Sequence, residues 1–122
     1  MNILLSFFAV LVVIFVIPIP VYAIFSAYFG VKEPEKKLNF LIGVLFQKIG
    51  TALGFVGLFY IGKEVFFDAW LAYSFLWFAM YALTEIGQTY MPNYSAKEAI
   101  AGIISEAIYF PLAGIIIVSI LK

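Results

Sequence analysis

Residues 3–29 read ILLSFFAVLVVIFVIPIPVYAIFSAYF and contain no charged side chain. An α-helix crosses the hydrocarbon core of a bilayer with about 20 apolar residues, so this run is long enough to span a membrane. A signal peptide is the alternative, because Val21-Tyr22-Ala23 has the small residues of a cleavage site. No Lys or Arg precedes the run, and it is too long for the apolar region of a signal peptide. We therefore expect a first transmembrane helix.

Two prolines, Pro18 and Pro20, lie near the middle of this run. A proline has no backbone N–H, so it leaves the carbonyl four residues earlier without its helical donor. The carbonyls concerned are those of Ile14 and Val16. The sequence therefore predicts a kink near Pro18.

The whole chain shares this apolar character. Apolar residues make up 66% of the 122 residues and charged residues 11%, against about 45–50% and about 25% in soluble domains. The composition predicts an all-α integral membrane protein, and the length allows four crossings with short loops. We expect a single domain, an up-down four-helix transmembrane bundle with spans at about 3–29, 38–62, 65–88 and 96–121.

Polar segments separate the four expected spans. Residues 32–37 (KEPEKK) form a charged cluster, residues 63–68 indicate a short turn, and residues 89–97 form a polar loop. Ser95-Ala96-Lys97-Glu98 is a capping box, which places the start of the last helix near Ala96.

The lysines near the ends of the spans predict the orientation. One end of the expected bundle has four of them (Lys32, Lys36, Lys37 and Lys97) and the other has two (Lys63 and Lys122). Since lysines accumulate in cytoplasmic loops, we expect both termini outside. The expected location is the cytoplasmic membrane of a prokaryote.

An internal repeat is a further hypothesis. A shift of 59 residues superposes Tyr22-Ala23 on Tyr81-Ala82 and Gln47 on Glu106. The matches predict two parallel hairpin repeats, related by an axis along the membrane normal. Chance identities in so biased a composition are the alternative.

The chain contains no Cys and no His, and its seven basic residues are all Lys. Iron–sulfur clusters and His-ligated haem or zinc are therefore excluded, and we expect no cofactor. The absence of Arg argues against phosphate recognition in a nucleic acid.

Two charged residues, Lys48 and Glu106, lie about ten residues into their expected helices. This corresponds to a depth of about 15 Å, near the middle of the bilayer. A lone charge there is costly, so each residue is the natural partner of the other. The pair is either structural, fixing the helix register, or a proton- or cation-handling site with Glu106 as the titratable group.

Other polar groups gather around Glu106 in the sequence. Pro111 frees the carbonyl of Ala107, while Ser105 and Tyr109 add hydroxyl groups. Such oxygen ligands suit a hydrated cation. The bland alternative is a common membrane proline whose freed carbonyl is satisfied by a neighbouring hydroxyl. The expected polar path also includes Glu85, Gln47 and Gln88.

The second expected helix carries a stripe of small residues. Gly43, Gly50 and Gly57 recur every seven residues, and Gly54 completes a GxxxG motif with Gly50. Glycines on one face let another helix approach closely. We expect this helix to be central or to lie at an oligomer interface.

Three classes of function fit the sequence. The main hypothesis is an accessory or structural subunit, with the bilayer and other membrane subunits or copies of itself as partners. The alternative is a small proton- or cation-coupled transporter or channel that uses Glu106, Lys48 and Glu85. The third is a membrane enzyme acting on lipid or quinone, with Glu106 and Tyr109 as an acid–base pair.

Overall fold

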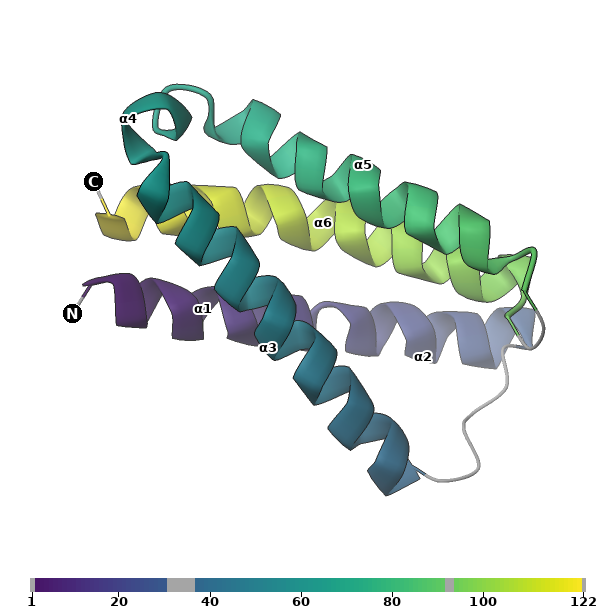
Figure 1. Ribbon diagram of the computed structural model, residues 1–122. Helices are drawn as coiled ribbons and strands as arrows, with labels where there is room; N and C mark the ends of the chain where they lie inside the picture. The colour runs from purple at the N-terminus through teal and green to yellow at the C-terminus, as the bar shows by residue number, and fades with distance from the viewer. Residues whose placement is uncertain (1, 31–36, 92–93, 122) are drawn as a thin grey trace.

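The computed structural model describes residues 2–30, 37–91 and 94–121, which are helical and contain no strand. Its helices are α1 (Asn2–Val16), α2 (Pro18–Phe29), α3 (Lys37–Ile61), α4 (Lys63–Phe66), α5 (Trp70–Gln88) and α6 (Ala96–Leu121) (Figure 1). Three stretches, Asn2–Phe29, Leu38–Ile61 and Ala96–Leu121, are long and apolar enough to cross a membrane. The predicted all-α class is thus confirmed, as is the presence of helices able to span a bilayer.

Some predictions concern residues outside these ranges: residues 32–36 of the charged cluster, residues 92–93 of the polar loop, and Lys122. The predicted cap of the last helix, at Ser95, lies within the described residues. The Ser95 side-chain oxygen accepts a hydrogen bond from the Glu98 N–H at 3.2 Å, and α6 begins at Ala96. The Ser95 side-chain cap and the start of the last helix near Ala96 are therefore confirmed.

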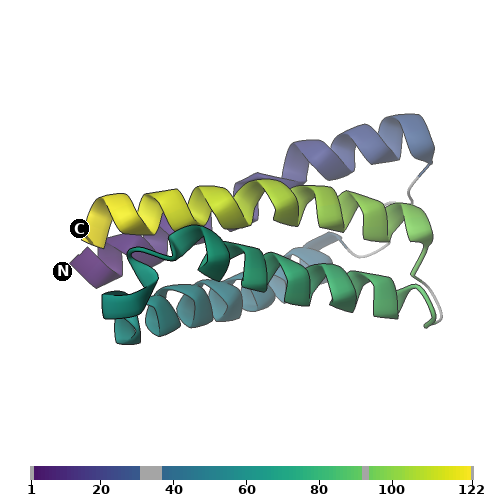
Figure 2. The same ribbon diagram turned by 90° about the horizontal axis from the view of Figure 1, so that it is seen from above.

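The first apolar stretch is interrupted at Ile17, between α1 and α2. Pro18 and Pro20 lie in the first turn of α2, and neither has the N–H that would continue the hydrogen bonding of α1. The two segments nevertheless continue each other in direction (Figures 1 and 2). α2 ends at Gly30, whose left-handed conformation (φ 72°) lets its N–H donate to the Phe25 carbonyl.

The third expected helix, 65–88, begins later than predicted, because α4 and a turn precede α5. The Gly62 carbonyl accepts hydrogen bonds from the backbone N–H groups of Val65 and Phe66 in α4, each at 2.9 Å. The rings of Phe66 and Phe67 pack on Phe59, with centroids 6.0 and 5.5 Å away. These contacts hold the turn against the end of α3, so α5 is shorter than the expected span.

Helix α6 is the centre of the fold. It packs against α5, α1 and α2, and α5 lies beside it in the opposite direction. Helix α3 packs on α1 but crosses obliquely, so that its N-terminal half diverges from the other helices (Figure 1). The large apolar side chains of this half are exposed: Leu38, Phe40, Leu41, Ile42, Leu45 and Phe46.

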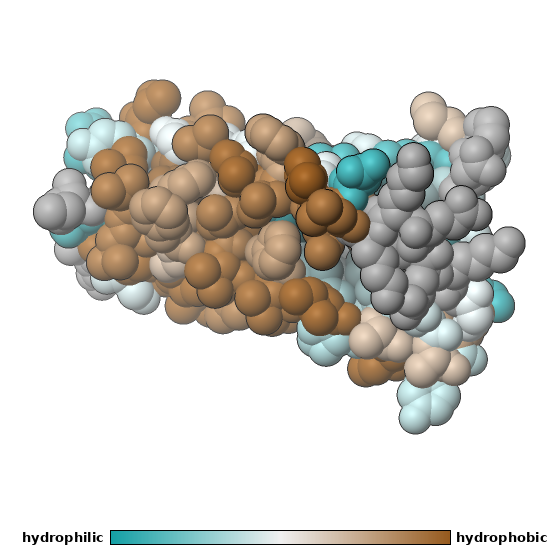
Figure 3. Space-filling model, turned by 90° about the horizontal axis from the view of Figure 1, so that it is seen from below, coloured by the Kyte–Doolittle hydropathy of each residue, from teal (hydrophilic) through white to brown (hydrophobic). Residues whose placement is uncertain are grey.

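Aromatic rings fill the core where α3, α5 and α6 meet. The centroid of Phe55 lies 5.0 Å from that of Tyr73 and 5.8 Å from those of Trp77 and Phe110. Phe55 and Phe110 are fully buried. Lipid chains are as apolar as these rings, so in a bilayer the contact would be stabilised by close packing and not by the removal of apolar surface from water. On the face in Figure 3, apolar side chains dominate toward the end with both termini, and polar ones become frequent toward the opposite end.

Two glycines of α6 allow α5 to approach closely. A Cβ at Gly114 would overlap the Ser74 hydroxyl group and would lie 3.0 Å from the Trp70 ring. A Cβ at Gly102 would lie 2.6 Å from a carboxyl oxygen of Glu85. Both positions therefore exclude a side chain unless α5 moves or its side chains rearrange.

The predicted glycine stripe of α3 behaves differently. Around Gly43, Gly50 and Gly57, a Cβ would meet no atom of the described residues within 4 Å. Only Gly54 faces another helix, with the Trp77 ring 3.0 Å from the Cβ position. Within the chain, the close approach that the stripe predicts therefore occurs at one of its four positions, because α3 crosses its neighbours obliquely.

Candidate functional site: a carboxyl pair between α5 and α6

The centre of the candidate site is Glu106 on α6. Only 4% of its surface is exposed. Its Oε1 atom is buried and has no hydrogen-bond partner in the described part of the chain. A buried carboxyl oxygen without a partner lowers the stability of the folded state by roughly 1–3 kcal/mol, and by more when it is charged. Its presence therefore requires an explanation.

Glu85 brings a second carboxyl group to the same place from α5. Its carboxyl lies over Gly102, one helical turn before Glu106. The Glu85 carboxyl is also close enough to interact electrostatically with that of Glu106. The sequence indicated both acids but not Gly102, whose missing side chain makes room for the pair.

Lys48 approaches the pair from α3. The sequence predicted Glu106 as its partner, but the Lys48 ammonium group is bonded to another residue. Its ammonium group donates a hydrogen bond to the Tyr109 hydroxyl at 3.3 Å and lies 4.7 Å from the centroid of that ring. Tyr109 is one turn beyond Glu106 on α6 and 1% exposed. Its ring and hydroxyl therefore satisfy the cation. Lys48 remains within electrostatic reach of both Glu106 and Glu85.

Hydroxyl groups that the sequence analysis missed surround the acids. The Tyr94 hydroxyl donates a short hydrogen bond to Glu85 Oε2. The Tyr22 hydroxyl lies near that of Tyr94 and donates to the Glu98 carbonyl at 3.5 Å. Nothing in the sequence distinguished these tyrosines from the other tyrosines of the chain.

The Tyr94 hydroxyl lies outside the helices, beside the start of α6. Burial raises the pKa of this hydroxyl above its usual value of about 10, and the hydrogen bond to Glu85 raises it further. Tyr94 therefore keeps its proton and remains a donor to Glu85 over the physiological pH range.

Other predicted residues do not join the cluster. The buried Ser105 hydroxyl donates to the Ala101 carbonyl of its own helix, at 2.9 Å. The side chains of Gln47 and Gln88 are exposed. Pro111 lies inside the continuous helix α6. The pair is thus made of Glu85 and Glu106, with Lys48, Tyr109 and Tyr94 around it.

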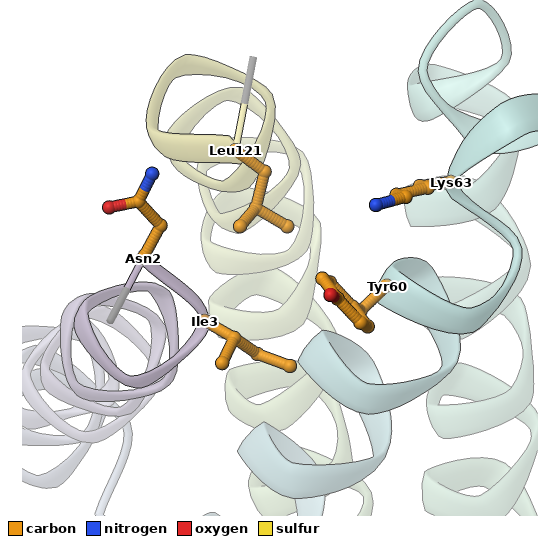
Figure 4. Close-up of a pocket in the computed structure, with 5 residues that line it drawn as sticks. All are labelled: Asn2, Ile3, Tyr60, Lys63 and Leu121. Carbon is orange, nitrogen blue, oxygen red and sulfur yellow. The ribbon is translucent and has the colours of Figure 1, made fainter.

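A pocket of about 430 Å³ opens at the opposite end of the molecule, near both termini (Figure 4). Lys63 extends into it, with its ammonium group 4.6 Å from the centroid of the Tyr60 ring. The aromatic core separates this pocket from Glu106. The lining residues are Asn2, Ile3, Tyr60, Lys63 and Leu121.

Protein-family models, curated proteins and solved structures give no match to this chain. In the described residues, no three His, Cys, Asp or Glu side chains gather as metal ligands. The chemistry present at the site is that of two carboxyl groups, one ammonium group and several hydroxyls. Groups of these kinds can bind and release protons.

Proposed function

We propose that this chain is a proton-handling integral membrane protein, in which the Glu85–Glu106 pair binds and releases a proton inside the bilayer. The observation that carries the proposal is the buried, unpartnered Oε1 atom of Glu106 beside a second carboxyl group. This function corresponds to the proton-coupled class among the three that fit the sequence.

Charge balance supports a proton at the pair. Glu85 and Glu106, both ionised, carry two negative charges against the single positive charge of Lys48. Two carboxyl groups close enough to interact electrostatically repel each other when both are ionised, so they share one proton. With that proton the cluster is neutral, and without it the cluster carries one negative charge in a medium of low dielectric constant.

The proposal includes four membrane crossings. Helix α5 has 19 residues, about 28 Å at 1.5 Å per residue, close to the roughly 30 Å of the hydrocarbon core. It runs antiparallel to α6 along their shared contact. An up-down bundle with both termini outside fits these lengths and the lysine distribution. The hairpin repeat stays a prediction.

A second candidate role is that of a subunit in a homo-oligomer or a larger membrane complex. The observation that favours it is the open face of α3, where Gly43 and Gly50 meet no atom within 4 Å. A partner helix would find close access there. Such assembly is compatible with proton handling, whereas no contact described above favours the enzyme hypothesis.

The test is proton release from the reconstituted protein after a step to alkaline pH, followed with a pH indicator. We expect Glu85→Gln and Glu106→Gln each to abolish one released proton while the protein stays folded. The matched control is Glu64→Gln, because Glu64 is exposed and outside the site. Release that is unchanged in Glu106→Gln would refute the proposal.

A further inference from the structure

The surroundings of the carboxyl pair differ along the axis of the bundle. Toward the α5–α6 connection, polar groups lead from the surface to Glu85. Exposed Lys97 donates to the Phe29 carbonyl at 2.8 Å, and the neighbouring Glu98 carbonyl accepts from Tyr22. Tyr22 contacts Tyr94, whose hydroxyl holds Glu85. The hydroxyls of Tyr22 and Tyr94, both half-buried, thus lie between this surface and Glu85.

Toward the termini the same path is blocked by aromatic rings. The Tyr109 and Phe110 rings follow directly on Glu106, with centroids 4.7 Å apart. Phe110 stacks on Trp77 at 6.0 Å and on Phe55 at 5.8 Å. The Tyr81 hydroxyl beside these rings is hydrogen-bonded to that of Thr51, and the Tyr73 hydroxyl, farther toward the termini, donates to the Phe55 carbonyl. The Tyr73 proton is therefore engaged within the core.

We infer that protons reach the carboxyl pair from one side of the membrane only, that of the α5–α6 connection, and that Tyr94 is the positioning residue holding Glu85 on this path. The role of the pair as a proton site rests on the proposed function, whereas its one-sided access is measured separately. The titratable groups that face the pair come from α2, α3, α5, α6 and the segment before α6, whereas α1 has none: Tyr22, Lys48, Tyr81, Glu98, Tyr109 and Tyr94.

Because the chain contains no Cys, a single introduced thiol reports access without background. The measurement is the rate at which the Glu106→Cys thiol reacts with a small, membrane-impermeant thiosulfonate in oriented proteoliposomes. Gln88→Cys marks the side of the α5–α6 connection and Asp68→Cys the side of the termini, since both residues are exposed. Ile108→Cys is the matched control, because Ile108 is at similar depth but 46% exposed on the outer face of α6.

We expect the Glu106→Cys thiol to react from the Gln88 side at least tenfold faster than from the Asp68 side. Reaction from the Asp68 side, equal rates from both sides, or a rate no higher than that of Ile108→Cys would each overturn the inference. If the Glu106→Cys protein does not reconstitute, Glu85→Cys gives the same comparison, because Glu85 lies on the same path.

Tyr94 is tested in the same assay. Tyr94→Phe removes the hydroxyl that holds Glu85, so we expect labelling of Glu106→Cys from the Gln88 side to accelerate about tenfold, the value of one hydrogen bond to a charged group. An unchanged rate would overturn the positioning role. Should proton release not depend on Glu106 while labelling stays one-sided, the proposed function fails and the access path stands.

Discussion

The α5–α6 contact contains two glycines in equivalent roles and with different consequences. At Gly114, the missing side chain admits Ser74 and Trp70, and the surroundings are aromatic and closely packed. At Gly102, it admits the Glu85 carboxyl beside Glu106. The same packing device therefore serves stability in one half and a titratable pair in the other. The role of each glycine depends on the α5 side chain that occupies the space beside it.

The largest expected effect is a loss of stability on substitution of Gly114. Gly114→Leu should reduce the free energy of unfolding by about 3 kcal/mol, because the new side chain overlaps Ser74 and the rigid Trp70 ring. Unfolding in detergent, followed by circular dichroism, measures it. Gly50→Leu, on the open face of α3, should change stability by less than about 0.5 kcal/mol in the monomer. Equal losses in both variants would show that the two glycines are equally packed.

Alanine at each α6 glycine separates the two halves. Gly114→Ala should cost about 1–2 kcal/mol of stability and leave proton release unchanged. Gly102→Ala should cost less, because Glu85 can move the end of its flexible side chain, but it should alter the pH at which the proton is released. Both changes gain similar helix propensity, so the difference between them is informative. Proton release altered only in Gly114→Ala would reverse the assignment.

Removing the cation tests the electrostatics of the pair. Lys48→Met withdraws the only positive charge that balances the two acids. The anionic state then becomes less favourable, and proton release should shift toward higher pH by roughly one unit or more. Lys63→Met, at the start of α4 near the termini, should give no shift. A shift toward lower pH would mean that Lys48 does not act on the pair.

The smallest effect concerns alkaline stability. The pKa of Tyr94 is raised in the folded protein, so its contribution to stability is fully present below the unfolded pKa of about 10 and is lost as the pH rises through the folded value. Tyr94→Phe should therefore flatten the fall in stability above pH 10. Tyr90→Phe is the control, because Tyr90 is 88% exposed. Identical alkaline profiles for the two variants would contradict the buried state of Tyr94.

Sequence reasoning reached the helical class and the start of α6 because both depend on local signals, apolar run length and the Ser95 cap. It also found the three charged residues of the site, since charges in apolar runs are conspicuous. It did not find the partner of Lys48, because that depends on the oblique crossing of α3. Nor did it single out Gly102 or Gly114, which lack the regular spacing of the α3 glycines.

The later start of α5 could not be predicted for a related reason. Lys63, Glu64 and Asp68 predicted a short turn beside Phe66 and Phe67, but they did not show where that turn ends. The packing of both rings on Phe59 holds the segment against the end of α3, and α5 begins only at Trp70. Sequence patterns give the length of apolar runs, whereas tertiary contacts decide which parts of them continue a helix.

The proton that we propose between Glu85 and Glu106 is tested most directly by infrared spectroscopy of the reconstituted protein near neutral pH. A protonated carboxyl group has a carbonyl stretch that carboxylates lack, and this band shifts in deuterated water. We predict the band in the unmodified protein and in Glu64→Gln. It should be absent from both Glu85→Gln and Glu106→Gln, because Lys48 neutralises the remaining carboxylate. Absence of the band from the unmodified protein, or its persistence in Glu106→Gln, would contradict the account.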